Sequence, residues 1–364
     1  FCGFLYINDM YNQDELNLIT LCSFEELTYK MRFELLGGLE REAPDFVNFK
    51  DKLIKSLSEG VYNKVRGRFF SEEYRRRILQ SLQRRNIVCV TYFSENYPEN
   101  LRQTPFPPIV LYCKGNVKLL NTRCFSVVGA RITAPNVLAE CKKISRELTQ
   151  HFTVVTGMAD GADSAAVEGA VENGKVISVL AYGFDYCYPA FNDRLIKSVE
   201  ERGLLITEHT PQIAPKAYLF PIRNRIIAGL SEGTLVVSAG NKSGALITAD
   251  YAIEYGRHLF VFPYNIGVAS GAGCNSLIKK GGMLTENILD ILSAFGLDFI
   301  ELEKPTLSED EQKLFALICE AGEIFLPEAA EKLGKLPFQL IPLLTSLEVK
   351  GLIVRLGGNR YSAV

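Results

Sequence analysis

Two arginines stand close together at the start of a predicted helix, in the triplet Arg223-Asn224-Arg225. The apolar pattern of this helix continues over Ile226–Leu230. A guanidinium group is planar, and its paired N–H groups match the paired oxygens of a phosphate or a carboxylate. The triplet therefore suggests a phosphate ligand, whereas Arg225 could instead pair with a carboxylate in the core.

A loop of small and polar residues follows the next predicted strand, Leu235–Val237. The loop contains Asn241, Ser243 and Gly244, and a second helix begins at Ala245. At a strand–loop–helix junction, free backbone N–H groups and the positive end of the helix dipole meet at one place. This arrangement predicts an anion site, and the three loop residues are its candidate contacts.

Further candidates stand in other loops that follow predicted strands. Gly129 and Arg131 follow one strand, Gly157 and Gly161 follow the next, and Lys216 lies in a loop farther along the chain. Ligands of α/β sheets bind outside the carboxyl ends of the strands, so these residues are expected to converge. Arg131 and Lys216 are interpreted as ligand contacts, while the glycines of the second loop serve equally well in a tight turn.

Two residues allow both a structural and a functional interpretation. Phe220 is flanked by Lys216 and Arg223, which suits a platform for stacking a base, but it could also belong to the core. Asp163 could cap its own helix or contact a ligand. The sequence leaves both alternatives open.

The elements that must position these residues are short, almost entirely apolar runs separated by helical patterns. Such runs are typical of strands buried on both faces of a parallel sheet. They predict an α/β fold with a doubly wound, Rossmann-like parallel sheet over about residues 121–295. The six predicted strands are Phe125–Val128, Thr153–Thr156, Val176–Leu180, Leu204–Thr207, Thr234–Ser238 and Leu259–Phe262.

The part of the chain before this sheet has a different character. Tyr11–Gly60 has a helical pattern, and Tyr62–Arg85 is rich in lysine and arginine. The basic run is interpreted as the solvated face of a helix. A further strand is predicted over Asn86–Tyr92, followed by a proline-rich connector at Pro105–Pro108.

The last part of the chain begins after a predicted linker at Glu301–Pro305. Three amphipathic helices and a hairpin predict a winged helix; the helices are Leu307–Cys319, Leu326–Leu333 and Phe338–Lys350. This part is acidic, and its third helix has Lys350 as its one basic residue. Since DNA affinity depends largely on neutralising phosphates, a contact with protein is expected here rather than strong binding of duplex DNA.

Composition excludes several classes of protein. The chain has 364 residues, which suggests two or three domains, and its net charge of −2 excludes a generally basic nucleic-acid coat protein. The nine cysteines form no CxxC pair, so free thiols in a reducing cytoplasm are expected rather than disulfides or a zinc site. No apolar run is long enough for a membrane span, and no signal segment is visible.

The stretch FPIRNRIIAGLS, followed by SGALITA, closely resembles the signature of the DNA-processing protein A family, DprA or Smf. The resemblance implies that Arg131, Lys216, Phe220 and Arg223 line a groove for single-stranded DNA. It implies that Asn224 and the Ser243-Gly244 loop support this groove.

The resemblance also implies a biological role. Members of the family are understood to protect incoming single-stranded DNA in natural transformation (competence), to help load the RecA recombinase, and to form homodimers through the Rossmann domain. The expected domains are a helical domain similar to a sterile alpha motif (1–85), a Rossmann-like DNA-binding domain (86–300) and a winged helix (301–364).

Three positions depart from the family pattern. Ser238 stands where the family usually has Glu, Tyr264 where it has Gly, and Val167 where His is frequent. The first and third changes argue against an ancestral enzymatic activity, and the second could reshape one rim of the groove.

No catalytic set is visible in the sequence. There is no Walker A loop, no GxGxxG after the first strand and no HExxH, and the three histidines show no ligand spacing. The chain is therefore interpreted as a binding protein without a cofactor or metal, not as an enzyme. The alternatives are a nucleotide-processing enzyme similar to phosphoribohydrolases, in which Glu254 would replace the usual glutamate, and a nucleotide-sensing module.

Overall fold

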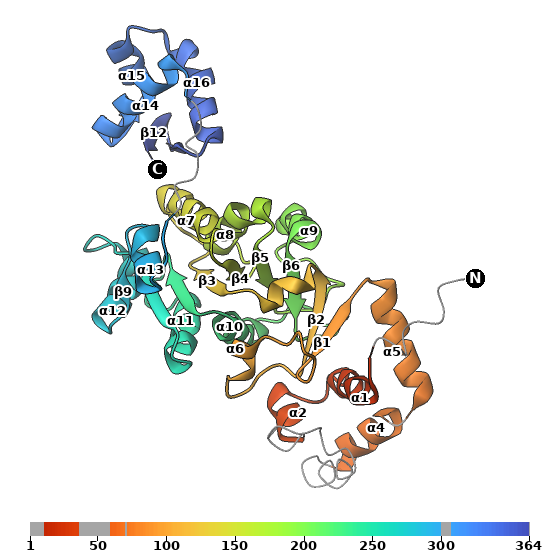
Figure 1. Cartoon of the computed structure of the whole chain (residues 1–364). Helices are drawn as coiled ribbons and strands as arrows, with labels where there is room; N and C mark the ends of the chain where they lie inside the picture. Colours follow the sequence, from red (N-terminus) through yellow and green to blue (C-terminus); the bar gives the residue numbers. More distant parts are fainter. Residues whose placement is uncertain (1–10, 36–58, 70, 300–306, 364) are drawn as a thin grey trace.

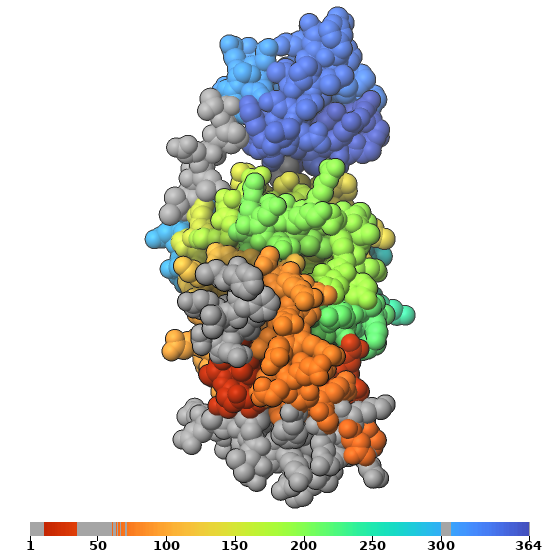
Figure 2. Space-filling model, turned by 90° about the vertical axis from the view of Figure 1, so that its right-hand side faces the viewer, coloured from red at the N-terminus to blue at the C-terminus, as the bar shows by residue number. Residues whose placement is uncertain are grey.

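The structure is a computed structural model that describes residues 11–35, 59–69, 71–299 and 307–363. Helices of the N-terminal part lie beside a central α/β layer structure, and a small C-terminal region follows (Figure 1). Figure 2 shows the C-terminal region, in blue, at one end of the molecule and the N-terminal helices, in red and orange, toward the other. The predicted linker Glu301–Pro305, and residues 36–58 of the predicted helical run, lie outside the described residues.

Nine strands of the described residues form one sheet, in the spatial order β1-β2-β6-β5-β4-β3-β7-β8-β9. The seven strands from β6 to β9 are parallel, and β2 is antiparallel to both β1 and β6. The strands are β1 (Val88–Thr91), β2 (Val110–Gly115), β3 (Cys124–Val128), β4 (Thr153–Thr156), β5 (Val176–Val179), β6 (Leu204–Thr207), β7 (Gly233–Val236), β8 (His258–Val261) and β9 (Met283–Leu284).

The direction of winding reverses between β3 and β7, which are neighbours in the sheet. From β3 the chain builds β4, β5 and β6 on one side, and it then returns to place β7, β8 and β9 on the other side. In open α/β sheets this reversal leaves a crevice outside the carboxyl ends of the two neighbouring strands. The topology therefore fixes where a ligand site is expected.

The predicted parallel strands are present, two with the predicted bounds and the others with shifts of one or two residues at their ends. The sequence did not identify β2, which follows the proline-rich connector, or β9, which has two residues. Neighbouring strands β3 and β4 pair Phe125 with Val154, and β3 and β7 pair Val127 with Leu235. These side chains are fully buried in one core cluster, which explains the uninterrupted apolar runs.

Helices cover both faces of the sheet (Figure 1). One face carries α7 (Pro135–Leu148), α8 (Ala162–Ala170), α9 (Asp193–Arg202) and α13 (Ile288–Ala294). The other carries α6 (Glu99–Arg102), α10 (Leu219–Leu230), α11 (Ala245–Glu254) and α12 (Ala272–Lys279). No helix in the described parts of the chain is long and apolar enough to cross a membrane.

Helix α10 corrects one expectation from the sequence. It begins at Leu219, so the triplet Arg223-Asn224-Arg225 lies inside the helix and does not open it. Pro221 is compatible with this earlier start, because a proline in the first turn removes no intrahelical hydrogen bond. The consequence is that the three side chains of the triplet point in different directions around the helix.

The N-terminal helices pack against strands β1 and β2 through their own apolar cluster. Their bounds are α1 (Gln13–Cys22), α2 (Tyr29–Leu35), α4 (Glu59–Phe69) and α5 (Glu72–Arg84). At the end of α5, Arg85 forms a two-pronged ion pair with Asp185, with Nε–Oδ1 and Nη2–Oδ2 distances of 2.7 and 2.8 Å. This contact ties the N-terminal part to the loop that follows β5.

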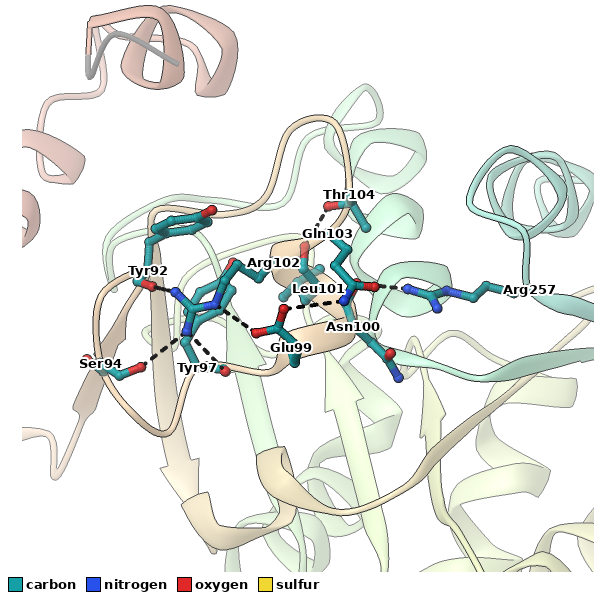
Figure 3. A network of polar contacts seen from close by, with 10 residues as sticks. All are labelled: Tyr92, Ser94, Tyr97, Glu99, Asn100, Leu101, Arg102, Gln103, Thr104 and Arg257. Carbon is teal, nitrogen blue, oxygen red and sulfur yellow. Dashed lines mark hydrogen bonds and ion pairs between the residues drawn. The ribbon is translucent and has the colours of Figure 1, made fainter. Parts of the chain in front are cut away.

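A network of arginines holds the segment between β1 and β2 in place (Figure 3). Arg102 donates hydrogen bonds to the backbone carbonyl of Tyr92, and its guanidinium lies 4.9 and 5.1 Å from the ring centroids of Tyr92 and Tyr97. Arg257, at the turn before β8, donates to the carbonyl of Asn100 at 2.9 Å. The network holds α6 beside α10 and ties it to the turn that precedes β8.

The C-terminal region contains three helices and, among the described residues, a three-stranded antiparallel sheet in the order β10-β12-β11. The elements are α14 (Glu309–Ala321), β10 (Glu323–Phe325), α15 (Leu326–Leu333), α16 (Pro337–Val349), β11 (Ile353–Leu356) and β12 (Arg360–Ala363). They enclose a separate apolar core. The helices agree closely with the predicted ranges, and β10 was not predicted.

Candidate nucleic-acid interface

A cavity of about 720 Å³ lies at the reversal point between β3 and β7. Loops after β3, β4 and β7 and the starts of α10 and α11 form its walls. Seven candidate residues from the sequence line it: Gly129, Arg131, Phe220, Arg223, Asn224, Ser243 and Gly244. The structure therefore brings together residues that are more than a hundred positions apart, at the place where α/β sheets bind ligands.

Arg131 projects from a turn that is held on both sides. The backbone N–H of Ala130 donates to Ser238 Oγ at 2.9 Å, and Ser238 Oγ lies 2.7 Å from the hydroxyl of Thr133. On the other side, a Cβ on Gly161 would overlap the carbonyl oxygen of Arg131. The backbone is thus fixed by two neighbouring loops, while the Arg131 side chain is exposed and forms no ion pair with another described residue.

Phe220 lies beside Arg131 in the first turn of α10. The Arg131 guanidinium carbon is 5.9 Å from the Phe220 ring centroid, within the range of a cation–π contact. The Phe220 ring centroid is also 5.6 Å from that of Tyr188. Phe220 is half-buried. It packs against the core on the inside and lines the cavity with the rest of its surface.

Arg223 is placed differently from what the sequence suggested. Its side chain is 4% exposed, and Nη1 donates hydrogen bonds to the carbonyls of Gly157 and Val179. Burial lowers the pKa of the guanidinium, and the nearby carboxylate of Asp163 opposes that shift. Arg223 borders the cavity, but its donors at Nη1 are already used to tie the loop after β4 to the end of β5.

Asp163 is a buried residue that lines the same cavity. Its carboxylate accepts a hydrogen bond from the backbone N–H of Ala159 at 3.2 Å, and Gly161 occupies the N-cap position of α8. Burial raises the pKa of the Asp163 carboxyl, and the positive charge of Arg223 partly offsets this effect. Asp163 therefore stabilises the loop that precedes its helix, next to the buried arginine.

The loop after β7, which the sequence suggested as an anion site, forms another side of the cavity. Asn224 Nδ2 donates to the carbonyl of Gly244 at 3.2 Å, which links α10 to the start of α11. Two backbone donors are used inside the loop, because Ser243 N–H bonds to Gly240 and Ala245 N–H bonds to Ser243 Oγ. The N–H groups that the sequence suggested as free are thus partly occupied.

Four candidate residues lie just outside the cavity lining. Lys216 is exposed between Pro215 and Ala217, which do line the cavity, so it stands at the rim. Asn241 is exposed in the loop after β7 and is likewise not a lining residue. Gly157 and Gly161 lie behind the wall, where they permit the close approach of Arg223 and Arg131.

Lys242 and Tyr188 are lining residues that were not among the candidates. Lys242 is exposed and lies in the loop that was predicted to bind an anion. Because Lys242 stands between Asn241 and Ser243, the sequence alone was enough to include it among the candidate contacts. Tyr188 lies in the loop that follows β5.

Arg225 lies on the opposite side of α10 from the cavity. Its Nη2 forms a buried ion pair with Glu208 Oε2, and its guanidinium carbon is 4.6 Å from the Tyr29 ring centroid. The expectation that Arg225 pairs with a carboxylate in the core is confirmed. The pair joins α10 to the loop after β6 and, through Tyr29, to the N-terminal helices.

The structure shows the surroundings of the three residues that depart from the family pattern. Ser238 accepts the hydrogen bond that fixes the Arg131 turn, and the Tyr264 hydroxyl donates to the carbonyl of Val237 at 2.9 Å. Val167 is fully buried in the core. Two of the departures, Ser238 and Tyr264, thus help to shape the loop after β7 next to the cavity.

The histidines and the described cysteines lie apart from this cavity. His151 bonds to the carbonyl of Asp298 at 2.8 Å, and His258 packs edge-on against Phe295. His209 is half-buried, and its partial burial lowers its pKa. All eight described cysteines are free thiols, and six of them are buried.

The fold and the site together define an α/β protein with a parallel-dominated sheet and a cationic, partly aromatic cavity at the reversal of the strand order. The chain belongs to the DNA recombination-mediator protein A family, whose sequence model matches residues 88–296. The matched range covers the sheet from β1 onward and every cavity residue described above.

Curated relatives agree with this assignment. The DNA processing protein DprA of Streptococcus pneumoniae is 37% identical over 200 residues, which cover 55% of this chain and 71% of the relative. The protein Smf of Escherichia coli is 34% identical over 297 residues, 76% of this chain and 78% of the relative. The relatives indicate a role in DNA processing and recombination mediation.

Solved structures show the same architecture. The X-ray structure of DprA from Streptococcus pneumoniae matches with a TM-score of 0.68 and 28% identity, over 80% of this chain and 99% of that one. A structure that describes the single-stranded DNA binding mode of DprA from Helicobacter pylori matches with a TM-score of 0.54 and 29% identity, over 59% and 97%.

Proposed function

We propose that the cavity between β3 and β7 binds single-stranded DNA. The observation that carries the proposal is the pairing of Arg131 with Phe220: an exposed guanidinium stands 5.9 Å from an aromatic ring at the mouth of one cavity. Phosphate clamping by a cation next to a ring that stacks a base is a common way to bind single strands without sequence preference. The related Helicobacter pylori protein, described as binding single-stranded DNA, supports the same assignment.

Each residue has a distinct part in this proposal. Arg131, Lys216 and Lys242 contact phosphates, because all three are exposed cations at the cavity or its rim. Phe220 stacks on a base. Arg223 does not clamp a phosphate through Nη1, and instead it ties the loop after β4 to the last residue of β5.

The wider role follows from the family. We infer that the protein protects single-stranded DNA, helps to load a RecA-type recombinase during natural transformation, works as a homodimer through its Rossmann domain, and does so in the cytoplasm. The N-terminal helices are proposed to form the domain similar to a sterile alpha motif, and the C-terminal region to form a winged helix. These roles rest on the similarity to DprA proteins and are separable from the DNA site.

The C-terminal region is proposed to contact protein rather than duplex DNA. Helix α16 contains a single charged residue, Glu348, and its exposed side chains include Phe338 and Ile341. Lys350, just after the helix, is engaged by Glu311 at 2.7 Å. A helix without free cations cannot neutralise phosphates, which is the main source of duplex affinity.

The enzymatic alternative depends on Glu254. This residue is exposed at the last position of α11, at the far end of the helix from the cavity, and it is not a lining residue. Binding without catalysis is therefore the better-supported function. Incubation with nucleoside monophosphates should release no free base, and release of base would favour the enzyme instead.

The decisive experiment compares a single-stranded oligonucleotide with a blunt duplex of the same sequence and length. We expect much tighter binding of the single strand, with little dependence on sequence, because a base must be unstacked to reach Phe220. Equal or tighter binding of the duplex would overturn the proposal. Titrations at several salt concentrations should show the linear dependence that phosphate contacts produce.

A further inference from the structure

A second aromatic side chain stands in the cavity next to Phe220. Tyr188 is 41% exposed and is a lining residue. Its ring centroid is 5.6 Å from that of Phe220, and the two ring planes are tilted by 58°. Rings at this separation are in mutual contact, so no base fits between them. The two rings instead form one continuous wall.

Phe220 has two close neighbours in the cavity. The ring centroid of Tyr188 lies 5.6 Å from that of Phe220, and the guanidinium carbon of Arg131 lies 5.9 Å from it. A strand that places a phosphate at Arg131 and a base on Phe220 therefore has a further aromatic surface beside it at Tyr188.

Buried contacts hold Tyr188 in this position. The Tyr182 side chain is 2% exposed, and its hydroxyl contacts the Tyr188 backbone twice. It accepts a hydrogen bond from the Tyr188 N–H at 3.1 Å and donates one to the Tyr188 carbonyl at 2.7 Å. Burial raises the pKa of Tyr182 to about 12, so its hydroxyl keeps its proton at neutral pH. By contrast, the Tyr188 hydroxyl forms no hydrogen bond with another described residue.

An ion pair with the N-terminal part of the chain also holds this loop in place. Asp185, three residues before Tyr188, receives both hydrogen bonds of the Arg85 guanidinium. The loop is thus fixed internally by Tyr182 and externally by the end of the N-terminal helices. An exposed aromatic ring on a loop with this many anchors is preorganised to bind a ligand, because little side-chain and loop freedom remains to be lost.

We propose that Tyr188 is a second base-contacting residue for single-stranded DNA and that Tyr182 is the positioning residue that holds it. This inference rests on the proposed function of the cavity. Tyr188 stacks against a base next to the one on Phe220, and its hydroxyl is available to a base edge. Because Tyr188 carries no charge, its contribution depends on the presence of a base and not on a phosphate.

The test compares two single strands of equal length, oligothymidylate and a strand in which every base is replaced by an abasic site. Affinities are measured by fluorescence anisotropy for the wild type, Tyr188→Ala, Tyr188→Phe and Tyr182→Phe. Tyr186→Ala is the matched control, because Tyr186 is a similarly exposed tyrosine on the same loop that does not line the cavity. Thermal melting of each variant checks that it is folded.

Tyr188→Ala is expected to weaken binding of oligothymidylate by roughly 5- to 150-fold, the range found when a stacked aromatic is removed. Binding of the abasic strand, and the slope of affinity against salt, should not change. Tyr188→Phe should keep most of the affinity, because it keeps the ring. Tyr182→Phe should weaken binding of oligothymidylate alone, and Tyr186→Ala should bind like the wild type.

Two results would overturn the inference: Tyr188→Ala binding oligothymidylate like the wild type, or losing equal affinity for both strands. The parallel variants Arg131→Ala and Phe220→Ala separate this failure from a failure of the proposed function. If they lose affinity while Tyr188→Ala does not, only the role of Tyr188 is wrong. If they also bind like the wild type, the cavity is not the DNA site.

Discussion

Gly157 and Arg223 are fitted to each other although they are 66 residues apart in the chain. The Arg223 guanidinium donates to the Gly157 carbonyl and occupies the space that a Cβ on Gly157 would need. Here a glycine that follows a strand serves the packing of a buried arginine. The hydrogen bond ties the loop after β4 to helix α10, which carries Phe220 three residues earlier.

This fit predicts that Gly157→Ala destabilises the fold. The added methyl group must displace a buried guanidinium, and overpacking of this kind costs about 1–3 kcal/mol. Arg223→Ala should also lower stability, by about 1–3 kcal/mol for a buried carbonyl left without its donor. Thermal or denaturant unfolding measures both effects. Unchanged stability of both variants would show that Arg223 is free to serve a ligand.

Arg131→Ala and Lys216→Ala should weaken binding of single-stranded DNA without changing the melting temperature, because both side chains are exposed. Each should also reduce the slope of log affinity against log salt by roughly 0.7, the value for one lost phosphate contact on a single strand. Arg355→Ala, in the exposed part of β11, is the control and should leave affinity and slope unchanged. A slope identical to the wild type in Arg131→Ala would count against its contact with phosphate.

Phe220→Ala should affect binding more than folding. Loss of a stacked base costs about 1–3 kcal/mol of binding free energy. Because Phe220 is only half-buried, its loss of stability should stay below the roughly 3–5 kcal/mol of a fully buried phenylalanine. Phe125→Ala, in the centre of the core, provides that reference. A large drop in melting temperature with normal DNA affinity would place Phe220 in the core alone.

Glu208→Gln should strongly destabilise the protein. The change leaves the buried Arg225 without its counter-charge, and breaking one side of a buried ion pair costs about 3–5 kcal/mol. Asp185→Asn is the comparison, since the Arg85–Asp185 pair is about one-third exposed and such pairs contribute only about 0–1 kcal/mol. Denaturant unfolding of the two variants measures the contrast, and similar losses in both would contradict it.

The stability of the C-terminal region should depend on pH through Glu311. Hydrogen bonds from Lys350, Ser346 and the Ser308 N–H lower the pKa of this carboxyl from an ordinary value of 4.5 to about 2. The folded state then binds the proton less tightly than the unfolded state. The stabilisation is therefore complete above pH 4.5 and is lost as the pH falls toward about 2. Melting temperatures of the wild type and Glu311→Gln should differ most above pH 4.5 and converge below it.

The amino-acid sequence alone predicted the parallel strands and several of the loops that line the cavity. A strand buried on both faces needs an uninterrupted apolar run, so segments such as Thr153–Thr156 and Leu204–Thr207 were predicted with their observed bounds. A small-residue loop after such a strand marks a helix start, and Ala245 was correctly predicted as the first residue of α11. These features are local, because each depends on residues within a few positions along the chain.

Only the tertiary structure decided what the long side chains do. Arg131 and Arg223 both belong to strand-end segments, yet one is exposed at the cavity and the other is buried under two backbone carbonyls. Tyr188 is held in place by the hydrogen bond from the Tyr182 hydroxyl to its carbonyl and by the contact of its ring with Phe220. The physical reason is that local periodicity encodes which face of an element is buried. The partners that a flexible side chain meets depend on which distant loops the strand order brings to the same edge of the sheet.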